Sequence, residues 1–290
     1  MSTLASLQRP SGGYAMLAVD QREALRNMMA EHTDVPVSDD DVRDFKLTAA
    51  RILSPFASAI LIDRQFALEQ AIEAGVVDAA CSIIASADHF ESAHGELVGR
   101  VTIDRQIDPH ALRDKGVAAL KLLVLYRPDG GADERRAMTE EFVAICRRAG
   151  LVSIVEPVSR KPLDDRSWDW GDGVFAAAEE LGSLGADLYK AEVPGHGESG
   201  EAVVRVGCRQ LTSIIAGPWV VLSSGVTEQR FPDAVRWACE EGASGFLAGR
   251  AVWASSLGAP DVVADLTEHA TLRLQALGEV VDEALRGRAQ

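Results

Sequence analysis

The sequence predicts an α/β fold, a single (β/α)8 TIM barrel, and three observations support this prediction. Eight short apolar, β-branched segments recur along the 290-residue chain, most of them followed by a turn and a segment with helical periodicity. These segments are continuously apolar rather than alternating, as in parallel strands buried on both faces. No linker rich in Gly, Pro or Ser interrupts the series. Residues 1–290 are therefore expected to form one domain, with a doubly wound sheet as the main alternative.

The order of the expected elements alternates between strand and helix. The strands are expected at 14–20, 58–63, 81–85, 118–125, 151–156, 186–192, 218–223 and 244–248. Helical periodicity predicts helices over 39–53, about 64–74, 133–149, 173–184, 201–214, 231–241 and 261–287. In 133–149, for example, Phe142, Ile145 and Ala149 share one stripe, and Gly150 follows as a helix stop. The segment 86–117 predicts irregular structure with a strand-like run at 101–104.

The composition is that of a globular protein and excludes several classes of partner. Hydrophobic residues make up 47% of the chain, and the formal charge is −15, from 29 Lys and Arg against 44 Asp and Glu. This excess of acid argues against nucleic acid and against an anionic membrane surface, but not against an anionic small molecule in a local basic pocket. The start of the chain lacks the pattern of a signal peptide, and no apolar run reaches the roughly 18 residues of a membrane helix. Four isolated cysteines predict buried thiols and a cytoplasmic protein.

Polar residues interrupt or follow the expected strands at the end where barrel enzymes place their chemistry. They are Asp20, Asp63, Lys121, Glu156, Lys190, Glu192, Ser223, Ser224 and Arg250. Asp20 and Asp63 either orient a substrate or cap the segments that follow them. Pro157, directly after Glu156, is expected to mark the end of the fifth strand.

Two lysines within apolar strands are the strongest chemical signal. Lys121 and Lys190 lie in the fourth and sixth strands, and Glu156 lies in the fifth, between them. Burial is expected to lower the pKa of such a lysine, and a neutral amine attacks a carbonyl to form a Schiff base. Glu156 would then shuttle protons during formation of the imine. The alternative is that Glu156 only neutralises the lysines.

The last two strands are followed by residues suited to bind an anion. Ser223-Ser224-Gly225 follows the seventh strand, and Gly249-Arg250 follows the eighth. Barrels often bind phosphate in these two loops, where glycine allows close approach and arginine supplies a charged fork. Arg250 is alternatively a surface salt-bridge partner.

Three weaker patterns point away from cofactors. Residues 195–200 match G-x-G-x-x-G, but no acidic residue lies in 215–225, so a loop over the barrel mouth is favoured over a dinucleotide site. His89 and His94 do not lie at a strand end, so no metal site is expected. Trp168 and Trp170 predict a solvated loop or an assembly contact.

Collinear strings from Ser11 to the C-terminal helix resemble a known family. They are GGYAMLAVDQREALRNMM, SPFASAILID, ALKLLVLYR, LVSIVEPV, GADLYKAEVP, WVVLSSGV and GASGFLAGRAVWA. They resemble the class I, metal-independent ketose-bisphosphate aldolases of the tagatose 1,6-bisphosphate aldolase type, and most of all the sulfofructosephosphate aldolases of sulfoquinovose breakdown. The resemblance implies retro-aldol cleavage of a sugar phosphate to dihydroxyacetone phosphate, without cofactor. The second product would be sulfolactaldehyde in the sulfosugar branch or glyceraldehyde 3-phosphate in the tagatose branch.

The resemblance also implies a role for each matching residue. Lys190 would form the Schiff base, Glu156 would act as acid and base, and Lys121 would assist. The AVDQRE motif would bring Asp20, Gln21 and Arg22 into the site, Asp20 as a further catalytic residue and Arg22 facing the far anionic group, and Ser223, Ser224, Gly249 and Arg250 would be the remaining anion contacts. From their positions after the strands, Asp63 and Gly225 are also expected to contact the substrate. The sequence departs from the family mainly in loops such as 159–172 and 195–200. A homo-oligomer is expected, and a non-catalytic sugar-phosphate-binding barrel is the remote alternative.

Overall fold

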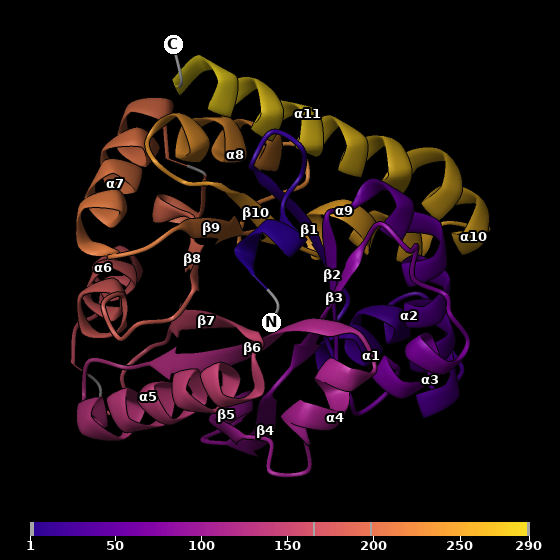
Figure 1. Ribbon diagram of the computed structural model, residues 1–290, viewed down its shortest axis with the longest axis horizontal. Helices are drawn as coiled ribbons and strands as arrows, with labels where there is room; N and C mark the ends of the chain where they lie inside the picture. Colours follow the sequence, from indigo (N-terminus) through magenta and orange to yellow (C-terminus); the bar gives the residue numbers. More distant parts are fainter. Residues whose placement is uncertain (1–2, 165, 198, 289–290) are drawn as a thin grey trace.

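Eight parallel strands close into a barrel, which confirms the predicted fold class (Figure 1). The computed structural model describes residues 3–164, 166–197 and 199–288. The barrel strands, in their order around the barrel, are β1 (Tyr14–Ala18), β10 (Gly245–Ala248), β9 (Trp219–Leu222), β8 (Leu188–Glu192), β7 (Val152–Ser159), β6 (Val117–Tyr126), β3 (Ser82–Ser86) and β2 (Ala59–Ile62). Each neighbouring pair runs parallel.

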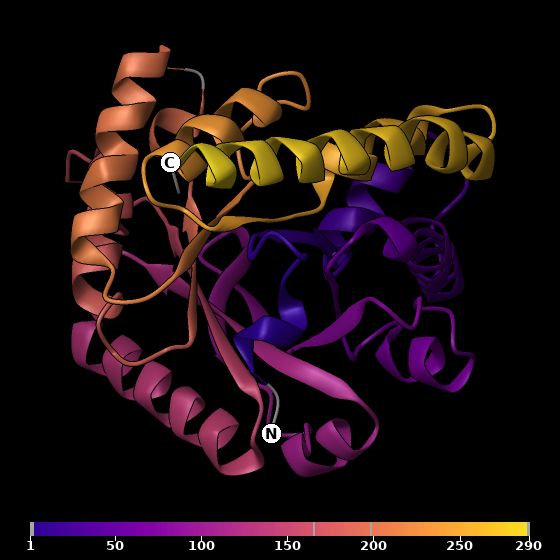
Figure 2. The ribbon, with the colours of Figure 1, turned by 45° about the horizontal axis from the view of Figure 1, so that its top comes forward.

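Helices surround the barrel, as Figures 1 and 2 show. They are α1 (Glu23–Ala30), α2 (Asp39–Leu53), α3 (Leu68–Glu73), α4 (Pro109–Asp114), α5 (Ala132–Ala149), α6 (Trp170–Leu181), α7 (Glu201–Ile214), α8 (Phe231–Glu240), α9 (Arg250–Trp253), α10 (Val262–Asp265) and α11 (Thr271–Arg288). The long helix α11 crosses one side of the barrel and packs against α8 and β1 (Figure 2). None of the described helices has the length and apolar character needed to cross a membrane.

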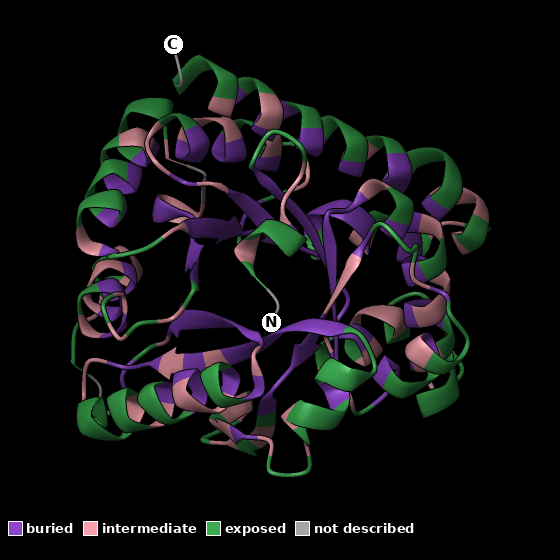
Figure 3. Ribbon diagram, viewed as in Figure 1, coloured by how far each residue is buried: buried purple, intermediate pink, exposed green. Residues whose placement is uncertain are grey.

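The alternation of side chains along each strand divides the core into two layers. One set of apolar residues packs between the barrel and the helices. The inward set includes residues such as Met16, Leu61 and Leu188, and Leu7 of the 3-10 helix η1 (Leu4–Leu7) joins this inner cluster. The strands are buried along most of their length, as Figure 3 shows. The polar side chains of Lys121, Glu156 and Lys190, by contrast, line a cavity.

Strand β7 is longer than the sequence predicts. It continues through Pro157 to Ser159, so the expectation that Pro157 ends the strand is wrong. The pairing of β7 with β8 covers only Ile154 and Val155, so the proline interrupts no ladder on that side. The extension is held by β6, where Tyr126 pairs with Ser159.

The segment that was expected to be irregular, 86–117, holds an antiparallel hairpin and a short helix. Strands β4 (Asp88–Ala93) and β5 (Glu96–Ile103) pair through a two-residue turn. His94 and Gly95 occupy this turn, and both have positive φ, 55° and 74°. The hairpin stands outside the barrel, next to β6, and contributes to the barrel mouth.

Candidate functional site

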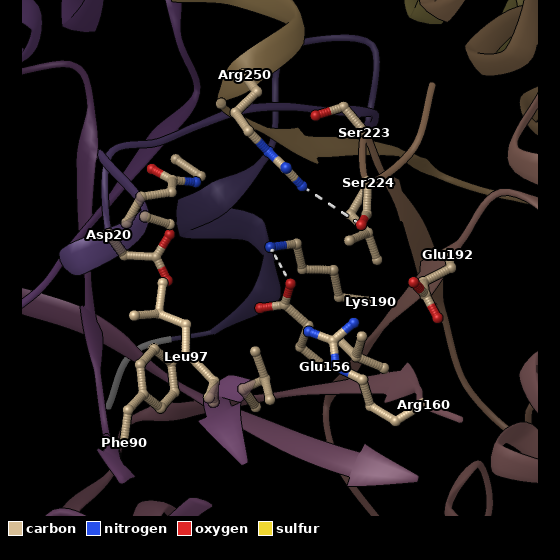
Figure 4. A pocket seen from close by; sticks show the side chains of 18 of the residues that line it. Asp20, Phe90, Leu97, Glu156, Arg160, Lys190, Glu192, Ser223, Ser224 and Arg250 are labelled. Atoms are coloured by element: carbon tan, nitrogen blue, oxygen red, sulfur yellow. Dashed lines mark hydrogen bonds and ion pairs between the residues drawn. The ribbon is translucent and has the colours of Figure 1, made fainter. Parts of the chain in front are cut away.

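A cavity of about 760 Å³ opens at the C-terminal ends of the barrel strands. Ten of the twelve residues that the sequence predicts for the site line it: Asp20, Gln21, Arg22, Lys121, Glu156, Lys190, Ser223, Ser224, Gly249 and Arg250. The other two, Asp63 and Gly225, are not among its lining residues. Figure 4 shows part of the cavity, with Lys190 and Glu156 near its centre.

Lys190 and Glu156 form a buried pair. Lys190 is 3% exposed and Glu156 is 6% exposed, and the lysine Nζ lies 2.9 Å from Glu156 Oε1. The two residues come from neighbouring strands, β8 and β7, at inward positions of the barrel. A carboxylate at this distance is able to take a proton from the lysine and return it to a group bound there.

Lys121 lies at the centre of a cluster of acidic side chains. Its Nζ is 2.7 Å from Asp20 Oδ2, 2.8 Å from Asp88 Oδ2 and 3.2 Å from Glu156 Oε2. Burial by itself would lower the pKa of Lys121, but attraction to the three carboxylates outweighs burial and raises the pKa above its ordinary value. The expectation that burial lowers the pKa of the strand lysines is therefore wrong for Lys121, which stays charged.

Asp20 belongs to the same cluster. Burial would raise the pKa of Asp20, but the charges of Lys121 and Lys190 hold it well below its ordinary value. Ser86 Oγ lies 3.3 Å from Asp20 Oδ2 and donates a hydrogen bond to it. Asp20 is thus an ionised neighbour of Lys121 at the cavity wall.

Asp88 is a member of the site that the sequence analysis missed. It accepts hydrogen bonds from Lys121 Nζ at 2.8 Å and from the backbone N–H of Leu123 at 3.1 Å. Arg22 Nη2 donates to the Asp88 carboxylate at 2.7 Å and to its backbone carbonyl at 2.9 Å. Asp88 begins the hairpin strand β4, in the segment that was expected to be irregular, so no strand end marked it in the sequence.

Asp63 does not contact the cavity, and its expected role in substrate binding is corrected. Its carboxylate is fully buried, pairs with Lys46 of α2 and accepts a hydrogen bond from the backbone N–H of Phe66 at 2.9 Å. Burial raises the pKa of Asp63 and lowers the pKa of Lys46. The pair therefore joins α2 to the end of β2 as a structural contact.

The loops after β9 and β10 form a second polar region of the cavity. Arg250 Nη2 lies 3.4 Å from Ser224 Oγ, and Ser223 lines the same wall (Figure 4). At Gly249 an added Cβ would lie 2.2 Å from the carbonyl oxygen of Ala18, so only glycine allows this turn to approach β1. Gly225 has a φ of +77°, and a Cβ there would lie 2.0 Å from His196 Nδ1.

Two loops cover the cavity with aromatic side chains. Trp170 and His196 stack with their ring centroids 3.3 Å apart, and both line the cavity together with Trp168. The sequence predicts a solvated loop or an assembly contact here, and Asp164, Arg166, Ser167 and Asp169 are indeed exposed, but the half-buried side chains of Trp168 and Trp170 line the cavity. Glu198, in the predicted mouth loop 195–200, lies outside the described residues.

Glu192 follows Lys190 by two positions on β8, and it also lines the cavity. Its Oε2 accepts a hydrogen bond from the backbone N–H of Ser159 at 2.8 Å. Burial raises the pKa of Glu192 to about 7, although this hydrogen bond and the charge of Arg160 act in the opposite direction. The cavity therefore holds a carboxyl group that changes its charge near neutral pH.

The arrangement combines an amine, an acid–base carboxyl group and a fixed positive charge. Glu156 contacts both Lys190 and Lys121 through its two carboxylate oxygens. Lys121 keeps a positive charge next to Glu156, so it stabilises the carboxylate when Glu156 gives up a proton. These are the groups required for imine formation and for a reaction that passes through an iminium ion.

Comparison with known proteins identifies relatives of this chain. The profile of the DeoC/LacD family aldolases matches residues 14–255. The chain is 27% identical over 279 residues to tagatose 1,6-diphosphate aldolase 2 of Streptococcus pyogenes serotype M3, an alignment that covers 85% of this chain and 82% of the relative. It is also 27% identical over 281 residues to tagatose 1,6-diphosphate aldolase of Listeria monocytogenes serotype 4a, covering 88% and 81%.

Solved structures of similar architecture include two aldolases. The fructose-bisphosphate aldolase from Plasmodium falciparum, in a ternary complex with TRAP and a small-molecule inhibitor, superimposes with a TM-score of 0.70 at 14% identity, over 97% of this chain and 93% of that chain. An archaeal fructose 1,6-bisphosphate aldolase superimposes with a TM-score of 0.63 at 18% identity, over 97% and 99%. At these identities the likeness concerns the fold.

Proposed function

Since this chain belongs to the DeoC/LacD family of aldolases, which are carbon–carbon lyases, we propose that it cleaves its substrate through a Schiff base on Lys190. The proposed substrate is 6-deoxy-6-sulfofructose 1-phosphate, and the products are dihydroxyacetone phosphate and sulfolactaldehyde. The observation that supports this chemistry best is the continuous contact from Lys190 through Glu156 to Lys121. A non-catalytic sugar-phosphate-binding barrel would not need this set of residues.

Imine formation begins with transfer of a proton from Lys190 to Glu156. The neutral amine adds to C2 of the open-chain ketose, and the carbonyl oxygen takes up a proton to give a carbinolamine. Glu156 then donates a proton to the departing hydroxyl group, so that water leaves and a protonated imine remains. Each time Glu156 gives up its proton, the positive charge of Lys121 stabilises the carboxylate that results.

Cleavage uses the protonated imine as the acceptor of an electron pair. A carboxylate of the site takes the proton of the C4 hydroxyl group, the C4–O bond becomes a carbonyl, and the electrons of the C3–C4 bond move into a C2–C3 enamine. The aldehyde leaves first. Protonation of the enamine at C3 and hydrolysis of the imine then release dihydroxyacetone phosphate and consume the water that was released earlier.

The cations that line the cavity suit a substrate with two anionic ends. Arg250 lies beside Ser224 on one side of Lys190, in the loops where barrels often bind phosphate. This position suits the C1 phosphate, because the imine fixes C2 next to β8. When the anionic groups at both ends of the substrate are bound, C2, C3 and C4 are held in place for the reaction. Contacts far from the cleaved bond therefore raise kcat as well as affinity.

The second candidate is cleavage of tagatose 1,6-bisphosphate to dihydroxyacetone phosphate and glyceraldehyde 3-phosphate. The names of the relatives from Streptococcus pyogenes and Listeria monocytogenes favour it. The two candidates share the imine chemistry and differ in the group at C6. A sulfonate has one charge and no proton near neutral pH, whereas a phosphate carries up to two charges.

Steady-state cleavage of the two substrates, measured side by side through the dihydroxyacetone phosphate released, tests the proposal. We expect a higher kcat/KM for the sulfosugar and no turnover by the Lys190→Met variant, which controls for contaminating aldolases. A higher kcat/KM for tagatose 1,6-bisphosphate would establish the second candidate. Failure to cleave either substrate would refute both.

A further inference from the structure

We infer that Arg160, with Lys161 next to it, binds the anionic group at C6 of the substrate. This inference rests on the proposed function, because it assumes that the substrate is fixed at C2 by Lys190. The family resemblance implies Arg22 as the contact of the far anion and no role for Arg160. The structure places Arg160 in the wall of the cavity, on the loop that follows β7.

The cations of the cavity divide into two groups by their partners. Six lysine and arginine side chains line it. Three of them are already paired with carboxylates: Arg22 with Asp88, Lys121 with Asp20, Asp88 and Glu156, and Lys190 with Glu156. The other three, Arg160, Lys161 and Arg250, form no ion pair with any carboxylate within residues 3–164, 166–197 and 199–288. In a chain with 44 acidic and 29 basic residues, cations without acidic partners at one cavity point to anionic ligands.

The extension of β7 determines where Arg160 points. Glu156 and Val158 lie on one face of β7, and Arg160, the first residue after the strand, lines the same cavity. The backbone N–H of Arg160 donates to the carbonyl oxygen of Tyr126 at 2.9 Å, which continues the pairing with β6. The backbone of Arg160, at the start of the loop, is therefore anchored to the barrel.

The order of the strands places Arg250 and Arg160 on opposite sides of Lys190. Lys190 is on β8, whose neighbours are β9 on one side and β7 on the other. Ser223, Ser224 and Arg250 follow β9 and β10, whereas Arg160 follows β7. In the view of Figure 4, the Lys190–Glu156 pair lies between the guanidinium groups of Arg250 and Arg160. A ketose held at C2 by Lys190, with its C1 phosphate at Arg250, thus extends its other end toward the side of Arg160.

Arg22 is less suited to bind the C6 anion because its guanidinium group is already paired with the carboxylate of Asp88. Its Nη2 makes two hydrogen bonds to Asp88, and its guanidinium group stacks 4.2 Å from the centre of the Phe90 ring. Arg160, which is half-buried, makes no such bond to a described carboxylate and faces the raised-pKa carboxyl group of Glu192 only at longer range. A sulfonate or phosphate would give Arg160 the charge-assisted hydrogen bonds that no carboxylate of the described residues gives it.

The test compares Arg160→Ala with wild type on a ketose 1-phosphate that carries a C6 sulfonate or phosphate and on one whose C6 is an uncharged hydroxyl. We expect kcat/KM for the C6-charged substrate to fall on the order of 10- to 100-fold, the value of a lost hydrogen bond to a charged group, with little change for the uncharged one. Arg160→Lys should restore part of the loss. The control is Arg166→Ala, since Arg166 lies in the same loop, is exposed, pairs with Asp164 and does not line the cavity.

Two results would overturn the inference. One is an equal loss for charged and uncharged substrates in Arg160→Ala, which would indicate a structural role. The other is selectivity that is lost in Arg22→Ala and retained in Arg160→Ala. Borohydride trapping of dihydroxyacetone phosphate by Arg160→Ala separates this inference from the proposed function, because the trapped product carries no C6 group. If Arg160→Ala traps dihydroxyacetone phosphate normally and keeps the wild-type preference for C6-charged substrates, the anion site at Arg160 is refuted and the Schiff base on Lys190 is not.

Discussion

Replacing Lys121 with methionine removes the positive charge that holds three buried carboxylates together. Lys121 is 1% exposed and lies 2.7 to 3.2 Å from Asp20, Asp88 and Glu156. Removing one partner of a buried ion pair leaves an uncompensated charge and costs about 3–5 kcal/mol of unfolding free energy. At roughly 2–4 °C per kcal/mol for a chain of this order of size, Tm should fall on the order of 10 °C.

The dependence of this loss on pH follows from the pKa of Asp20. In the wild type, Lys121 and Lys190 hold that pKa below the value in the unfolded chain, so the cluster stabilises the fold above the unfolded pKa and loses this contribution at lower pH. Without Lys121, the largest attraction that opposes burial is lost, so the pKa of Asp20 in the folded variant should rise above its wild-type value, and protonation should relieve the uncompensated charge as the pH falls. The stability deficit of Lys121→Met should therefore shrink as the pH falls from 7 toward 4.

Urea denaturation of wild type and variant across this pH range measures the effect. The matched control is Lys115→Met, because the Lys115 side chain is 45% exposed and its ion pair with Glu69 spans 3.9 Å. Its loss should cost about 1 kcal/mol or less. If Lys121→Met and Lys115→Met lost the same stability, or if the deficit of Lys121→Met grew at low pH, the account of the cluster would be wrong.

Three further predictions concern other parts of the protein. Asp63→Asn should cost about 3–5 kcal/mol of stability, because it breaks the buried pair with Lys46, yet leave kcat/KM close to wild type; a large loss of kcat/KM in the folded variant would return Asp63 to the site. Burial raises the pKa of Glu192 from 4.5 to about 7, so the folded chain binds this proton more tightly than the unfolded chain does. The free energy of unfolding should therefore decrease by on the order of 3 kcal/mol as the pH rises from 4.5 to 7. Urea denaturation of Glu192→Gln should lack this decline, and an unchanged pH profile would contradict the assignment. Exhaustive dialysis against EDTA should leave aldol cleavage intact, because the proposed chemistry assigns charge stabilisation to lysine and arginine; a loss reversed by Zn²⁺ would argue for a metal-dependent aldolase.

The barrel and much of the site follow from local patterns in the sequence. Continuous apolar runs predict all eight barrel strands, because each strand is buried on both faces. Lys121, Glu156 and Lys190 interrupt these runs, so their position at the cavity is predicted as well. The expected homo-oligomer and the cytoplasmic location stay predictions.

The residues that the sequence analysis missed depend on contacts between distant segments. Asp88 reaches Lys121 only because the segment after β3 forms a hairpin beside β6. Arg160 was missed because Pro157 suggested the end of the strand, whereas pairing with β6 carries β7 further. Lys46 did give a signal, since it falls on the buried stripe of α2, where a charged residue requires a partner.

Reduction with borohydride in the presence of dihydroxyacetone phosphate, followed by peptide mapping, tests the central claim most directly. The imine is converted to a stable secondary amine, so the adduct marks the lysine that forms the Schiff base. We expect the adduct on Lys190 alone and no adduct in Lys190→Met, because among the described residues Lys190 pairs with one carboxylate, that of Glu156, whereas Lys121 is held by three. An adduct on Lys121, or the absence of any adduct in an enzyme that still cleaves its substrate, would contradict the account.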